Sequence, residues 1–122
     1  MSDDKVRLAV PAQPEYMRLA RLTAAGLASR LGFSYDEVED LRIAVDELCY
    51  LLVGPDGRSG TITLTYALDG PSLVVEGEGA SEGQPTEFAD LSKQILAAIV
   101  DDYDVTRRDG SVAFRMVHRR QS

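Results

Sequence analysis

Residues 34–53 read SYDEVEDLRIAVDELCYLLV, and this stretch decides the fold because it carries a full set of helix signals. Ser34 and Glu37 have the spacing of a capping box, in which each side chain bonds the backbone N–H of the other residue. Phe33 and Val38 stand at the positions of a hydrophobic staple around that start. Apolar residues then recur every three or four positions, which predicts one buried helix face; they are Val38, Leu41, Val45, Leu48 and Leu52. The sequence Gly54-Pro55-Asp56-Gly57 predicts that the helix ends near Val53.

Upstream of this helix the sequence predicts a strand followed by another helix. Residues 6–10 are apolar-rich, and Pro11 and Pro14 mark the end of the strand. The next segment, from about Glu15 to Leu31, has helical periodicity, and Gly32 is typical of the position that follows a helix end. The residues assigned to its buried face are Tyr16, Ala20, Thr23, Leu27 and Leu31.

Downstream, the pattern favours β-structure interrupted by a third helix. Residues 61–67 alternate in polarity, and Asp69-Gly70 indicates a hairpin into a strand over residues 72–76. Residues 77–85 are predicted to form a loop. Helical spacing returns in a set that comprises Phe88, Leu91, Ile95, Ala98 and Ile99. Two further strands are expected over residues 103–107 and 111–117.

The resulting order, β-α-α-β-β-α-β-β, predicts an α+β fold. We expect a single domain over residues 1–122, built as a two-layer α/β sandwich. In it, three helices cover one face of a mixed, mainly antiparallel sheet of about five strands, and both helical stripes face the sheet.

Composition excludes several classes of function. The 122 residues carry 20 acidic and 13 basic side chains, and the net charge of −7 disfavours nucleic acid or an anionic membrane as partner. With one cysteine, Cys49, and one histidine, His118, no His/Cys-rich zinc site is expected. The start MSDDKV lacks the pattern of a signal peptide, and no apolar run has the length of a membrane span. We therefore expect a cytoplasmic protein.

Two stretches resemble anti-sigma factors of the serine-kinase type, which belong to the histidine-kinase-like, or Bergerat-fold, ATPases. They are VRLAVPAQPEYMRLARLTAAGLASRLGFSYDEVEDLRIAVDELC, residues 6–49, and VDDYDVTRRDGSVAFRMVHR, residues 100–119. The resemblance implies a Bergerat-type fold. It also implies partner switching, in which the protein binds a sigma factor and is released by an antagonist. In this family the ATP-bound kinase phosphorylates the antagonist on Ser or Thr.

The resemblance places the family's chemistry on a Glu and an Asn four residues apart on the second helix. Glu47 matches the base position, and we interpret it as a vestigial, solvated carboxylate. The Asn that holds magnesium in the family is Leu51 here. A leucine offers no oxygen to a hard cation, so the match is broken at the metal.

Two further family motifs are also altered. The D-x-G box that reads adenine maps to Gly77-Glu78-Gly79, where Gly77 replaces the Asp; a shift by one residue would offer Glu76 instead. The glycines that cradle phosphate map to Asp90 and Ser92. Three losses against one ligand predict a degenerate site that has no cofactor, although the family uses Mg-ATP. We expect no metal.

Arg21 on the first helix matches a family arginine that contacts both the sigma factor and the antagonist. Guanidinium groups suit protein interfaces because they bind carboxylates with two parallel hydrogen bonds. We therefore assign Arg21 to a partner-binding surface, with a solvated helix face as the alternative. Arg18, one turn away, is placed beside it, although for Arg18 itself a solvated helix face is the favoured interpretation. The resemblance also implies a homodimer, and the apolar strand over residues 6–10 is the expected edge for pairing.

The function expected from these features is that of an anti-sigma-factor-like binding protein, which acts through protein contacts without productive ATP binding. One alternative is a divergent ATP-dependent protein serine/threonine kinase and anti-sigma factor. Another is a noncatalytic subunit that pairs with an intact paralogue. Leu51 and Asp90 argue against the kinase.

Overall fold

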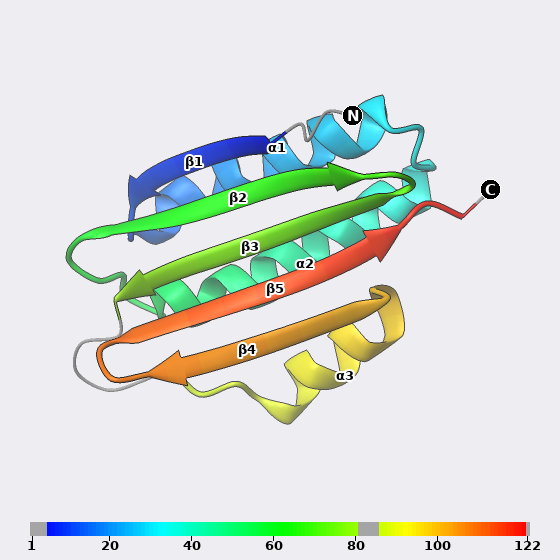
Figure 1. Cartoon of the computed structure of the whole chain (residues 1–122). Coiled ribbons are helices and arrows are strands. Elements are labelled where there is room, and N and C mark those ends of the chain that lie inside the picture. Colours follow the sequence, from blue (N-terminus) through cyan, green and yellow to red (C-terminus); the bar gives the residue numbers. More distant parts are fainter. Residues whose placement is uncertain (1–4, 81–85, 122) are drawn as a thin grey trace.

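The computed structural model describes residues 5–80 and 86–121 and has two layers (Figure 1). One layer is a five-stranded sheet and the other consists of three helices; in Figure 1, α1 and α2 lie behind the sheet and α3 lies next to β4. The expected α+β sandwich is confirmed. The elements are β1 (Lys5–Pro11), a 3₁₀ turn (Pro14–Tyr16), α1 (Met17–Arg30), α2 (Tyr35–Val53), β2 (Thr61–Asp69), β3 (Ser72–Ala80), α3 (Asp90–Ile99), β4 (Asp102–Arg108) and β5 (Ser111–Arg119).

The sheet has the strand order β1-β2-β3-β5-β4, and each of these neighbouring pairs is antiparallel. The parallel pairing that a mixed sheet would need does not occur among these five strands. Two tight hairpins account for the antiparallel pairs β2–β3 and β4–β5: Gly70 and Gly110 have φ values of 59° and 77°, the left-handed backbone that such turns require. Strand β5 then inserts between β3 and β4.

Helix α2 forms as its sequence predicts. The Ser34 side chain accepts from the N–H of Glu37, and Glu37 in turn accepts from the N–H of Ser34 at 2.7 Å. Of the predicted stripe, Leu41, Val45, Leu48 and Leu52 are fully buried, whereas Val38, in the first turn, is half-buried and packs against the core. The helix ends at Gly54, whose φ of 75° a residue with a side chain rarely adopts.

Helix α1 differs from the expectation in which residues it buries. The buried positions are Met17, Ala20, Ala24 and Ala28, whereas Tyr16, Thr23, Leu27 and Leu31 are only half-buried. Small alanines let the helix lie close to its neighbours. A pattern of large apolar side chains therefore does not identify this buried face. A hydrogen bond of 2.9 Å from the Tyr66 hydroxyl to the Ala20 carbonyl ties α1 to the sheet.

Two other sequence predictions were wrong. Residues 77–80 belong to β3 and not to a loop, because they pair with residues 111–114 of β5; residues 81–85 lie outside the described part. In α3 the fully buried residue is Leu96, while Leu91 and Ala98 are exposed. Within the described residues, no helix has the length and apolarity to cross a membrane.

Candidate functional site

Helix α2 brings Glu47 and Leu51 to the side where the resemblance places the chemistry of the family. The two residues are one helical turn apart, so they lie on one side of the helix. Glu47 is half-exposed, whereas Leu51 is only 1% exposed and belongs to the core cluster that also contains Leu96 of α3. The position of the expected metal ligand is therefore part of the apolar core. Over residues 5–80 and 86–121, no three acidic, histidine or cysteine side chains are grouped to hold a metal.

Strand β3 places Gly77 and Gly79 on the sheet face that the helices cover. A Cβ atom added to Gly77 would lie 2.5 Å from the Phe114 ring and 2.8 Å from a Leu64 methyl group. A Cβ atom on Gly79 would lie 2.9 Å from a methyl group of Ile62. Apolar side chains thus fill the space beside Gly77 and Gly79, the positions to which the resemblance assigns the D-x-G box.

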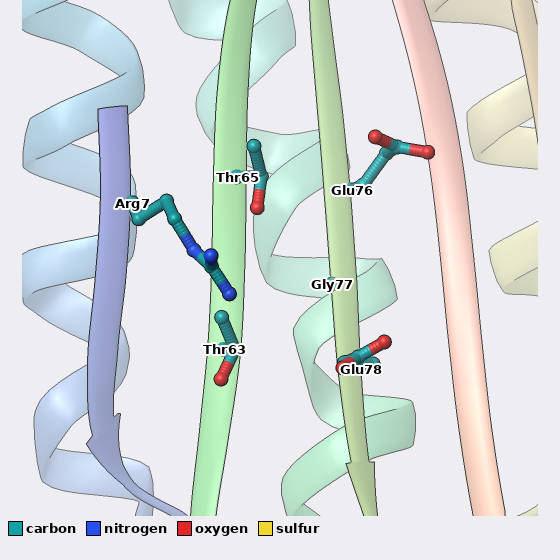
Figure 2. Close-up of a pocket in the computed structure, with 6 residues that line it drawn as sticks. All are labelled: Arg7, Thr63, Thr65, Glu76, Gly77 and Glu78. Atoms are coloured by element: carbon teal, nitrogen blue, oxygen red, sulfur yellow. The ribbon is translucent and has the colours of Figure 1, made fainter. Parts of the chain in front are cut away.

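The alternative register for this motif, with Glu76 as the acid, meets a geometric obstacle. Successive residues of a strand point to opposite faces of the sheet. Glu76 and Glu78 are exposed, and Figure 2 shows their side chains on the face away from the helices. Glu76 pairs there with Arg115 at 3.9 Å. Its carboxylate is therefore on the wrong side of the sheet for a ligand between sheet and helices.

The start of α3 carries Asp90 and Ser92 where the family has glycines. The Asp90 side chain is 95% exposed and lies 3.9 Å from the Lys93 ammonium, while Ser92 is half-buried. A carboxylate in the first turn of a helix compensates the positive end of the helix dipole that a phosphate would use.

A different group of residues is exposed on the outer side of α1 and α2. Arg21 of α1 donates a hydrogen bond of 2.8 Å to Asp46 of α2, and the two side chains are 31% and 46% exposed. Ile43 and Tyr50, about one turn before and after Asp46, are 43% and 47% exposed. Leu22, next to Arg21, is 53% exposed. We call this set the outer helix surface; it consists of Arg18, Arg21, Leu22, Ile43, Asp46 and Tyr50.

The outer helix surface combines the guanidinium group of Arg21 with exposed apolar side chains. Arg18 is exposed, as the sequence suggested, and Arg21 is anchored at one end by Asp46. The sequence analysis missed Asp46, because the 25 residues between it and Arg21 hide a contact that only the helical hairpin creates. Aromatic and arginine side chains of this kind are enriched in protein interfaces.

Two other titratable groups belong to the framework. Burial raises the pKa of the Cys49 thiol to about 12, so the thiol stays protonated and inert near neutral pH. The hydrogen bond from the backbone N–H of Ser34 holds the pKa of the Glu37 carboxyl below its usual range. Glu37 also accepts from the N–H of Gln121 at 2.6 Å, which fastens the chain after β5 to the start of α2.

An antiparallel sheet covered on one face by three helices is consistent with the fold of the histidine-kinase-like ATPases. The sequence model described as "Histidine kinase-like ATPase domain" matches residues 10–117, so the chain belongs to this family. It is similar to the serine-protein kinase RsbW of Bacillus subtilis (strain 168), with 41% identity over 103 residues and 80% of this chain. RsbW of Bacillus pumilus (strain SAFR-032) is 36% identical over 105 residues. The chain spans 64% and 65% of the lengths of these relatives.

Proposed function

We propose that this protein is a regulator of the anti-sigma type that binds protein partners through contacts alone, without productive Mg-ATP binding. The proposal rests on the packing at Gly77, where Phe114 and Leu64 fill the space of the family's adenine-reading acid. Membership of the family and similarity to the RsbW kinases support the regulatory role. In this reading the protein is a pseudokinase in a partner-switching circuit, and Glu47 has no catalytic task.

The physical argument against Mg-ATP is one of solvation and space. A magnesium-phosphate cluster beside Leu51 would lose water without gaining an oxygen ligand from that position, and burying unpaired charge is costly. The adenine ring of the nucleotide would have to displace the Phe114 ring, and close-packed interiors resist such displacement. The carboxylate of Asp90 would also repel phosphate at the start of α3.

The proposed partner site is the outer helix surface, with Arg21 as its anchor and Arg18 beside it. Asp46 holds one nitrogen of the Arg21 guanidinium, which keeps the side chain extended across the two helices. The remaining N–H groups are donors for a partner carboxylate. The exposed Leu22, Ile43 and Tyr50 supply the apolar area that a stable contact needs. The proposed partners are a sigma factor, an antagonist, or both.

The proposal also covers the oligomeric state of the protein. We expect a homodimer, as the resemblance implies. The alternative of a noncatalytic subunit that pairs with an intact paralogue uses the same fold and the same partner surface. A divergent kinase is the competing activity, and it requires Mg-ATP to bind. The protein is expected to act in the cytoplasm.

Two measurements test this proposal. Isothermal titration of the purified protein with Mg-ATP and Mg-ADP is expected to give no binding at millimolar ligand, whereas a saturable isotherm would favour the divergent kinase. Affinity capture from the native cell, followed by identification of the bound chain, then assigns the partner. A sigma factor or an antagonist supports the proposal, and a paralogous kinase points to the noncatalytic subunit. A capture with Arg21→Ala as bait, compared with Arg42→Ala as the control, tests whether the outer helix surface binds the partner.

A further inference from the structure

Strand β1 is an edge of the sheet, because β2 is its only neighbour among the five strands that the structure describes. The hydrogen bonds between these two strands show which backbone groups are left over. Just after β1, the N–H of Ala12 donates to the Gly60 carbonyl at 3.0 Å, which continues the register of the pair. Alternate residues of a strand direct their backbone groups to the same side. The N–H and C=O groups of Val6, Leu8 and Val10 therefore face β2.

The outward backbone groups of β1 consequently belong to Lys5, Arg7 and Ala9. Pro11 has the next outward position, where proline, which has no N–H, leaves no donor without a partner. A row of outward N–H and C=O groups is a template on which an extended segment can add as a further strand. Within the described residues, no strand of this chain uses that template.

The side chains of β1 determine which kind of strand fits this edge. On the side of the sheet away from the helices β1 carries Lys5 and Arg7, both exposed, and Figure 2 shows Arg7 on this side. On the side of the helices it carries Val6, which is 39% exposed, and the half-buried Leu8. Strand β1 has no acidic residue, so one side of the edge is cationic and the other is apolar. Side chains directly opposite each other on paired strands interact, and opposite charges attract.

We propose that β1 accepts an added strand from a partner protein, a segment in which acidic residues alternate with apolar ones. The acidic side chains lie opposite Lys5 and Arg7, and the apolar ones lie opposite Val6 and Leu8. Such alternation suits a strand, whose successive side chains point to opposite faces. A second copy of this chain fits the edge less well, because antiparallel pairing of two β1 strands brings cations together. The edge and the outer helix surface share no residue, so this contact goes beyond the proposed function.

A synthetic peptide tests this proposal without an identified partner. The probe is an acetylated and amidated peptide of alternating glutamate and valine, with the 7 residues of β1 as its length. The control peptide has lysine in place of glutamate. Amide hydrogen exchange of the isotope-labelled protein is followed by NMR at millimolar peptide. With the glutamate peptide, exchange at the N–H groups of Arg7 and Ala9 is expected to slow at least about fivefold, because both become hydrogen-bonded. Exchange at Leu8, already bonded to β2, should stay unchanged, and the lysine peptide should have no effect.

Two variants separate the backbone contact from the charge. Ala9→Pro removes one outward N–H, and a proline is tolerated on an edge strand where the N–H faces solvent. Arg7→Glu reverses one charge. Each is expected to weaken binding of the glutamate peptide at least about fivefold. Arg115→Glu, on β5 and exposed like Arg7, is the matched control and should leave the binding unchanged. Circular dichroism establishes that each variant is folded.

The outcomes decide between an acidic strand, no strand and a second copy. Slowed exchange at Arg7 and Ala9 that is reduced in both variants supports the added strand. Unchanged exchange at these two groups, or equal binding of the two peptides, overturns it. Light scattering gives the remaining outcome: if the wild type is a dimer and Ala9→Pro is a monomer, a second copy occupies the edge and the proposal fails. None of these results depends on Mg-ATP or on Arg21, so the proposed function is tested separately.

Discussion

The two faces of the sheet differ in burial and charge, and successive residues of strand β3 alternate between them. Toward the helices it presents Val75 and Gly77, which pack with fully buried or nearly buried side chains. Toward solvent it presents Glu76 and Glu78. The inner face is filled by apolar groups, which leave no room for a side chain at Gly77, while the outer face is charged. The contrast follows from the alternation of a strand, which turns successive side chains to opposite faces, here one packed against helices and one in water.

The largest expected effect comes from returning an acid to the inner face. In Gly77→Asp the new Cβ atom meets the Phe114 ring and Leu64, and the carboxylate is buried without a partner. Overpacking costs about 1–3 kcal/mol and the unpaired charge adds several more, so we expect a loss of at least about 4 kcal/mol in the free energy of unfolding. Urea denaturation measures it. Glu78→Asp, one residue on but facing solvent, should stay within about 0.5 kcal/mol. Equal stability of both variants would contradict the contrast between the faces.

A second test of the inner face uses the family's metal position. Leu51→Asn removes a buried isobutyl group and buries an amide, so the expected loss in the free energy of unfolding is about 2–4 kcal/mol. The exposed neighbour Tyr50→Asn is the control. We expect no thermal shift with Mg-ATP in Leu51→Asn, because Gly77 and Asp90 are unchanged. A shift of several degrees would show that the pocket can open, since a ligand that binds the native state raises its stability.

A smaller effect is expected in acid, from the buried start of α2. Because the folded pKa of Glu37 is lowered, its ionised form stabilises the protein above the ordinary carboxyl pKa of 4.5. That contribution is lost as pH falls through the lowered folded pKa. The stability difference between wild type and Glu37→Gln should therefore be constant near neutral pH and shrink below about pH 4.5. A difference that grows in acid would reverse the sign and contradict the assignment.

The smallest effect on stability is expected at the outer helix surface. Arg21→Ala removes a half-exposed ion pair, so the free energy of unfolding should change by less than about 0.5 kcal/mol. Affinity for the captured partner should nevertheless fall at least about tenfold, because interface arginines are frequent anchors. Titration of that partner into wild type, Arg21→Ala and the control Arg42→Ala measures the difference. Equal affinities would place the interface elsewhere.

The sequence predicted best what local signals encode. The capping box at Ser34 and the turn at Gly70 fixed element ends because each depends on residues within one turn of the chain. Glycine and glutamate are rare in strands, so the composition of residues 77–80 predicts a loop, yet their pairing with β5 holds them extended. Contacts such as Arg21–Asp46 join residues far apart along the chain, so no local sequence pattern predicts them. The positions of the family motifs were identified by resemblance, but how the side chains at these positions pack is visible only in the structure.

The bond from Gln121 to Glu37 joins residues 84 positions apart, and Arg120 reaches back in the same way to the Leu31 carbonyl at 2.6 Å. During synthesis, therefore, the corner between α1 and α2 emerges from the ribosome long before its last partners exist. The corner lacks these two hydrogen bonds until β5 has inserted between β3 and β4. Contacts of such long range are slow to close, so completion of the fold is a late event that depends on the C-terminal strand.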